Sequence, residues 1–97
     1  MTKVNIIFDN VLEDVDIIAI PDEVVAKIEA IGQEFLKWVT NANDSDYRTI
    51  IDGQEYLVAE TDGFIKWLNL HHCTETEKAY VVERNTNYCP QYKTIDF

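Results

Sequence analysis

Hydrophobic and polar residues alternate in short runs along this chain, and in two stretches the alternation gives way to helical spacing. The first runs are rich in β-branched residues and fall at residues 4–8 and 15–20, with the mainly polar residues 9–14 between them. Alternation of this kind is typical of strands that bury one face. The N-terminal part therefore predicts two strands that pair through a turn at 9–14.

A helical pattern follows at Pro21. Proline presets a helical φ and lacks an N–H that the first turn would leave unpaired, and Asp22 and Glu23 suit the positive end of the helix dipole. Apolar residues then recur at spacings of four, three, four and three, namely Val24, Ile28, Ile31, Phe35 and Trp38. This stripe predicts one amphipathic helix that ends in the polar loop at residues 40–46.

The pair Asp52-Gly53 is the clearest local signal. It stands between two β-prone runs within residues 47–60. Asp-Gly favours a two-residue turn with positive φ at both central positions. These residues therefore predict a β-hairpin.

The last part of the chain predicts one more helix and two more strands. Thr61 is the predicted N-cap of the helix. Its core-facing residues keep the spacing i, i+3, i+4, i+7, at Phe64, Trp67, Leu68 and His71. Residues 79–84 predict a fifth strand, and residues 92–97 predict a last strand at the sheet edge.

The predicted order is β-β-α-β-β-α-β-β within a single domain, residues 1–97. Short connections and a strong hairpin favour a mainly antiparallel sheet with both helices packed on one face. The fold class predicted from these patterns is α+β.

Charge narrows the range of partners. The chain has 18 Asp and Glu against 8 Lys and Arg, which gives a formal net charge of −10. Such a potential repels nucleic acid and anionic membrane and attracts basic surfaces. The N-terminus becomes acidic too early for a signal peptide and no run is long enough for a membrane span, so the sequence predicts a cytoplasmic protein. Charge that serves solubility alone is the competing interpretation.

Both histidines and one of the two cysteines fall together in the stretch LHHCTETE, residues 70–77. A zinc site would need His71, His72, Cys73 and Cys89 to converge in a tetrahedron. Consecutive helical residues point about 100° apart, which separates three of these ligands. We predict instead that His71 completes the apolar stripe, that His72 lies at the helix C-terminus, and that Cys73 is a small buried hydrophobe.

Catalytic alternatives are weaker. A thiol at a helix C-terminus has a raised pKa, so Cys73 is a poor nucleophile, and whether it pairs with Cys89 depends on geometry. The carboxylates near Asp44 and Asp46 lack the glycine of a calcium loop. Three scattered glycines form no phosphate-binding loop. The sequence therefore predicts no enzyme, no metal and no cofactor.

An acidic protein-binding surface remains, between Asp44 and Glu60. Tyrosines beside carboxylates suit the recognition of a basic partner, because the rings supply contact area and the charges supply steering. An ordinary polar sheet edge is the alternative. The predicted partner-binding residues are Asp44, Asp46, Tyr47, Asp52, Glu55, Tyr56 and Glu60.

The chain resembles the small acidic immunity proteins of bacterial toxin–immunity pairs, including those of contact-dependent inhibition systems. The resemblance lies in size, charge and the stretches IPDEVVAKIEAIGQEFLKWV, DGFIKWLN and YKTIDF. It implies an antitoxin that binds a cognate basic toxin, often a nuclease, as a monomer in a 1:1 complex and blocks its active site. A DNA-mimic inhibitor such as an anti-CRISPR protein and a small metal-binding regulatory protein are the alternatives.

Overall fold

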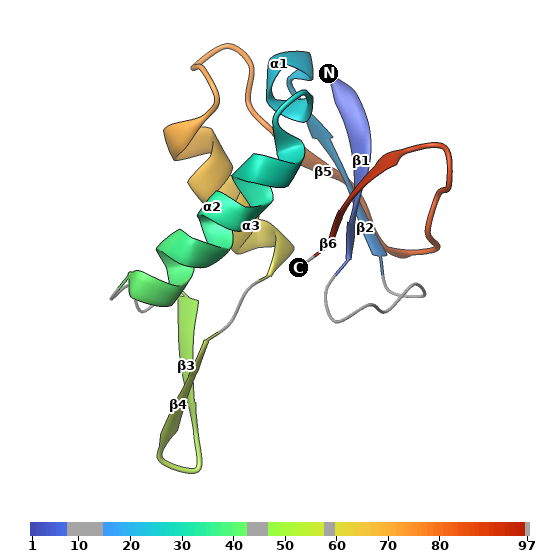
Figure 1. Ribbon diagram of the computed structural model, residues 1–97. Coiled ribbons are helices and arrows are strands. Elements are labelled where there is room, and N and C mark those ends of the chain that lie inside the picture. Colours follow the sequence, from blue (N-terminus) through green and yellow to red (C-terminus); the bar gives the residue numbers. More distant parts are fainter. Residues whose placement is uncertain (8–14, 43–46, 58–59, 97) are drawn as a thin grey trace.

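The computed structural model describes residues 1–7, 15–42, 47–57 and 60–96. These residues form an α+β fold, the class that the sequence predicted, in the order ββααββαββ, which has one helix more than the predicted order (Figure 1). The predicted Phe8 strand end, the turn at 9–14 and most of the predicted loop at 40–46 lie outside the described residues. Within the described part of the chain, six strands are divided between two sheets, one of four strands and one of two.

The larger sheet holds the first and last strands of the chain. Its order is β5-β2-β1-β6, so the predicted edge position of the last strand is confirmed. β1 pairs antiparallel with β2 and parallel with β6, and β2 pairs antiparallel with β5. The strands are β1 (Thr2–Ile7), β2 (Val15–Ile20), β5 (Tyr80–Thr86) and β6 (Lys93–Asp96).

The helices are α1 (Asp22–Val25), α2 (Ile28–Asn41) and α3 (Thr61–His71). The single helix predicted from Pro21 onward was wrong, because the chain leaves helical geometry at Lys27 (φ −116°, ψ 17°). The Lys27 N–H donates to the carbonyl of Val24, three residues earlier, whereas an α-helical bond spans four residues. This tighter turn separates α1 from α2. α1 is held at the N-terminus of the chain, where the Thr2 hydroxyl donates to the Asp22 carboxylate.

One face of the larger sheet packs on all three helices and forms the main core. Alternation along β1 and β2 directs every second side chain to this face. The sheet contributes Val4, Ile6, Ile18, Ile20 and Ile95. The helices contribute Val24, Val25, Ile28, Ile31, Phe35, Val39, Phe64, Trp67 and Leu68. Trp38, predicted as part of the buried stripe, is only half-buried, and Val39 takes the buried position in that turn.

The opposite face of the sheet has a smaller apolar cluster of Ile7, Val15 and Ile17, on which Cys89 and Tyr92 pack. The fully buried Asn5 side chain attaches the segment that precedes β6, which contains Cys89 and Tyr92, to β1. Its Nδ2 donates to the carbonyl of Cys89 at 2.8 Å, and its Oδ1 accepts from the Cys89 N–H at 3.1 Å. The Asn5 side chain thus satisfies backbone groups of the loop before β6, which would otherwise lack a hydrogen-bond partner on the sheet.

The predicted hairpin forms the second sheet, with β3 (Arg48–Ile51) and β4 (Gln54–Leu57). It stands away from the four-stranded sheet, beyond the ends of α2 and α3 (Figure 1). Among the described residues, no helix combines the length and the apolar character that crossing a bilayer requires.

Candidate protein-binding site

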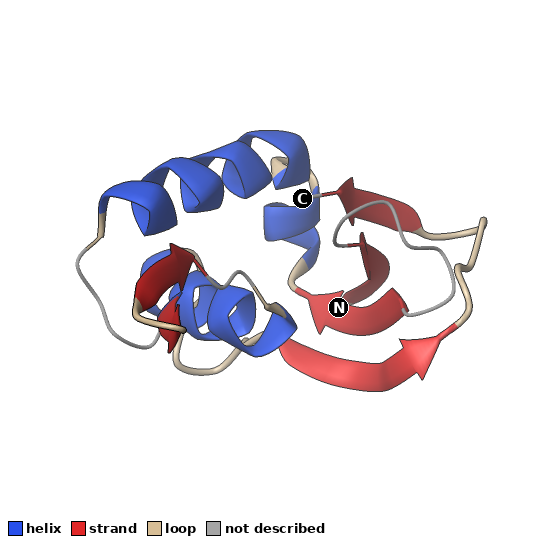
Figure 2. Cartoon of the chain, turned by 90° about the horizontal axis from the view of Figure 1, so that it is seen from below, coloured by secondary structure: helices blue, strands red, loops and turns tan. Residues whose placement is uncertain are grey.

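The β3–β4 hairpin projects beyond the helices in Figure 1, and Figure 2 shows it among the helices and away from the strands of the larger sheet. Its turn has φ 53° at Asp52 and 82° at Gly53, so the predicted turn with two positive φ values is confirmed. The register pairs Ile51 with Gln54 and Ile50 with Glu55. The turn therefore fixes which side chains share a face.

Each face of the hairpin carries a large exposed apolar side chain. Alternation places Ile50 and Glu55 on one face, and Ile51 and Tyr56 on the other. Ile50 is 72 % exposed, Ile51 55 % and Tyr56 46 %. A two-stranded hairpin usually gains stability by packing one face on a core. This hairpin exposes large apolar groups on both faces, which makes it a candidate for contact with another molecule.

The base of the hairpin is firmly held by Arg48. Its Nη2 donates to the carbonyls of Val39 at 3.1 Å, Thr40 at 3.0 Å and Ala42 at 2.8 Å, at the C-terminus of α2. A cation at this position satisfies carbonyls that have no partner within the helix and complements the helix dipole. The Arg48 Nε lies 3.8 Å from Glu55 Oε1, which connects the base to the next strand. The hairpin is thus exposed but anchored.

Tyr47, directly before β3, forms a second anchor. It was predicted to be a partner-binding residue, and its 3 % exposure excludes it from the surface. Its ring packs edge-on against Trp38 and Phe35, and its hydroxyl donates to the Gly63 carbonyl. Tyr47 therefore positions the hairpin from within the core.

The other predicted partner-binding residues have mixed outcomes. Asp52, Glu55, Tyr56 and Glu60 are exposed, and Asp44 and Asp46 lie outside the described residues. Asp52 lies in the turn at the tip of the hairpin and Glu55 lies opposite Ile50, while Glu60 immediately precedes α3. Asp52, Glu55 and Tyr56 thus lie on the hairpin, whereas Glu60 does not.

The sequence analysis missed Ile50 and Ile51. The signal was present, because adjacent strand residues point to opposite faces and a two-stranded hairpin cannot bury both. Two consecutive isoleucines before Asp-Gly therefore required at least one exposed apolar side chain.

The stretch at residues 70–77 ends α3 and leads toward β5. His71 is exposed, so its predicted core-facing position was wrong, although its ring lies tilted against the rings of Trp38 and Trp67. His72 Nε2 lies 3.2 Å from Glu34 Oε2 without forming a hydrogen bond, and the contact is an ion pair only when the ring is protonated. Thr61, the predicted N-cap, instead donates its hydroxyl to Asp16 of β2.

Cys73 and Cys89 lie on different sides of the larger sheet. Cys73 packs against the main core and Cys89 against the smaller cluster, and both thiols are free. Burial raises the pKa of the Cys73 thiol. Within the described part of the chain, no three His, Cys, Asp or Glu side chains are grouped closely enough to hold a metal ion.

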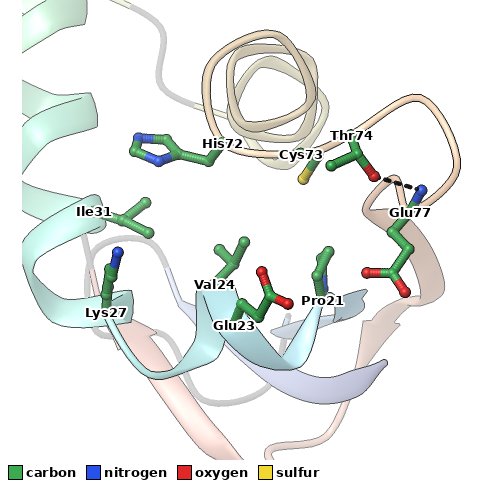
Figure 3. A pocket seen from close by; sticks show the side chains of 9 residues that line it. All are labelled: Pro21, Glu23, Val24, Lys27, Ile31, His72, Cys73, Thr74 and Glu77. Carbon is green, nitrogen blue, oxygen red and sulfur yellow. Dashed lines mark hydrogen bonds between the residues drawn. The ribbon is translucent and has the colours of Figure 1, made fainter.

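A small cavity separates Cys73 from α1 (Figure 3). Its volume is about 120 Å³, and Val24, Ile31 and Glu77 are among its lining residues. Thr74 Oγ1 accepts from the Glu77 N–H at 3.1 Å and closes the turn at its edge. Small-molecule sites have volumes of about 300–1,000 Å³, so this space suits a few water molecules better than a substrate.

Comparisons of the chain with protein-family models, with curated proteins and with solved structures found no match.

Proposed function

We propose that this protein is a non-catalytic inhibitor that binds a basic partner protein and inserts the β3–β4 hairpin into the partner's cationic cleft. The partner class that fits is a nuclease toxin, with this chain as the immunity protein in a 1:1 complex. The observation that carries the proposal is the anchored hairpin with exposed apolar side chains on both faces.

A cleft suits this hairpin better than a flat surface. A flat partner would cover either Ile50 or Ile51, because the two residues lie on opposite faces. The two walls of a cleft cover both. Because Arg48 and Tyr47 already order the base of the hairpin, less conformational entropy is lost when the hairpin binds.

Charge supports the same partner. A nuclease must present cationic groups to bind phosphates. A net charge of −10 attracts such a surface and raises the rate of association at low salt. Asp52 at the tip would enter the cleft first, followed by Glu55 beside the apolar residues.

The test is a pull-down with three baits: the wild-type protein, the hairpin variant Ile50→Thr/Ile51→Thr, and the control Leu70→Gln. Threonine keeps the β-branched shape, and Leu70 is an equally exposed apolar residue that lies on α3. We expect the wild-type protein and the control to recover the same basic protein and to inhibit its nuclease activity.

The hairpin variant should bind that protein at least about tenfold more weakly, because buried apolar anchors dominate interface energies. Association should also slow steeply as salt is raised. Equal binding by the hairpin variant, a partner that is not basic, or binding without inhibition would contradict the proposal. A partner from a nucleic-acid-guided defence complex would favour the DNA-mimic class instead.

A further inference from the structure

A groove between α2 and α3 lies beside the base of the hairpin. Its volume is about 440 Å³, and its lining residues include Glu34, Lys37, Trp38, Ala42, Trp67 and His71. The Ala42 carbonyl accepts a hydrogen bond from Arg48 Nη2 at 2.8 Å, so the groove and the hairpin share a boundary. A standard interface involves about 20–30 residues on each side, more than the hairpin provides, so adjoining surface must contribute.

The rings of Trp38, Trp67 and His71 form one wall of this groove, which we call the aromatic groove. The ring centroids of Trp38 and Trp67 lie 6.4 Å apart, and His71 lies 6.1 Å from Trp38 and 5.5 Å from Trp67. Trp67 is buried and supports the wall from behind, whereas Trp38 is half-buried and His71 is exposed. The faces of such rings carry partial negative charge, and indole attracts cations most strongly.

A carboxylate stands at the same groove. Glu34 is 55 % exposed at its side chain and approaches the partly buried His72 at 3.2 Å. An apolar side chain over this carboxylate would exclude water and leave it only the contact with His72, at high cost, whereas a cationic side chain would compensate it. Lys37 also lines the groove, and its positive charge repels a bound cation. Removing that charge should therefore tighten cation binding, which can be measured.

We propose that the aromatic groove binds the guanidinium group of an arginine side chain of the basic partner, with the planar cation stacked on Trp38 and its N–H groups donating to Glu34. The proposal rests on the proposed function for its partner. Arginine suits the site better than lysine, because its planar group stacks on rings and pairs with a carboxylate at the same time. The groove thus supplies a specificity contact beside the inserted hairpin.

The test is a titration of the ¹⁵N-labelled protein with N-acetyl-arginine amide, followed at the two indole N–H signals. N-acetyl-citrulline amide is the control, because it is neutral and has nearly the same shape. We expect saturable shifts of the Trp38 indole at millimolar arginine, with citrulline about fivefold weaker or more. Equal shifts with both compounds, or no saturable shift, would overturn the assignment.

Charge variants on α2 sharpen the result. Glu34→Gln should weaken arginine binding about three- to tenfold, and Lys37→Gln should tighten it up to about threefold. Glu29→Gln makes the same change of charge as Glu34→Gln at an exposed position outside the groove lining and should leave the affinity unchanged. If Glu29→Gln weakens binding as much as Glu34→Gln, general charge and not the groove binds arginine.

Trp38→Leu should abolish the saturable shift, now followed at nearby backbone amides. Because Trp38 packs on Phe35 and Tyr47, the exposed Glu34→Gln variant tests the site even if this variant fails to fold. None of these measurements requires the partner. Failure of the arginine titration therefore overturns the groove alone, and failure of the pull-down overturns the inhibitor function alone.

Discussion

The ring of Tyr47 lies against the backbone of Gly63. A Cβ atom at Gly63 would stand 2.7 Å from Cε1 of that ring, and the Tyr47 hydroxyl donates to the Gly63 carbonyl at 3.1 Å. This contact joins the base of the hairpin to the first turn of α3. It explains why a residue without a side chain stands inside a helix, where glycine is otherwise unfavourable.

Gly63→Ala should therefore destabilise the fold. Alanine gains about 1 kcal/mol of helix propensity over glycine. Overpacking against a rigid ring opposes this by about 1–3 kcal/mol. Trp38 and Phe35 hold the ring in place, so we expect the upper part of that range and a net loss of about 1–2 kcal/mol. Urea unfolding followed by circular dichroism measures the difference.

The control is the same substitution in a Tyr47→Leu background. Without the ring, alanine at position 63 should be neutral or stabilising, because only the propensity gain remains. An equal loss in both backgrounds would show that the contact with Tyr47 is not the cause.

Asn5 should be essential to the segment that precedes β6. Asn5→Ala leaves the Cys89 N–H without its partner and removes one of two hydrogen bonds that the Cys89 carbonyl accepts, since the Tyr92 N–H also donates to that carbonyl. The unsatisfied N–H costs about 1–3 kcal/mol and the lost bond to the carbonyl about 0.5–1.5 kcal/mol, so we expect a loss of about 2–4 kcal/mol in urea unfolding. The Cys89 thiol should also react faster with a disulfide reagent, since the segment is released from the sheet.

Asn69→Ala is the matched comparison for Asn5. The Asn69 side chain also forms two hydrogen bonds to one backbone residue, Ala79, but Asn69 is only half-buried. Ala79 is buried, but removing the half-buried Asn69 side chain opens a path for water to its freed N–H and carbonyl, so the loss should be about 1–2 kcal/mol. A smaller loss for Asn5→Ala than for Asn69→Ala would contradict the role assigned to Asn5.

Local signals in the sequence predicted the elements that local physics determines. The hairpin turn follows from Asp52-Gly53, and the strands follow from alternation of β-branched residues. The break at Lys27 has no glycine or proline to announce it. It accompanies the contact of Asp22 with Thr2, which is distant in sequence.

The candidate site was predictable only in part, for the same reason. Tyr47 looked like a surface anchor beside acidic residues, but its position depends on Gly63, sixteen residues later. Thr61 looked like a helix cap, but its hydroxyl donates to Asp16, which lies on β2 and is distant in sequence. Composition and spacing carry no information about such partners, because tertiary packing selects among local options that are similar in energy.

The exposed isoleucines of the hairpin should contribute little to the stability of the isolated protein. Ile50→Thr/Ile51→Thr removes apolar surface that is already in water and keeps the β-branched shape that strands favour. We expect the free energy of unfolding to change by less than about 0.5 kcal/mol per site. A loss above about 2 kcal/mol would show that the hairpin supports the fold, and its exposure would then be no evidence for a partner.

Cys73 should react slowly with alkylating reagents, and its reaction rate should reach half of its maximum only at a high pH. Burial raises the pKa of its thiol above the ordinary 9.0, outweighing the backbone hydrogen bond from Ala79, which lowers it. At any pH below the raised value a smaller fraction is thiolate, and only the thiolate reacts. In a Cys89→Ser variant, the midpoint of the pH–rate profile for alkylation by iodoacetamide should therefore lie at a higher pH than the midpoint for a free cysteine peptide. A profile at or below that of the peptide would contradict this placement and reopen Cys73 as a catalytic thiol.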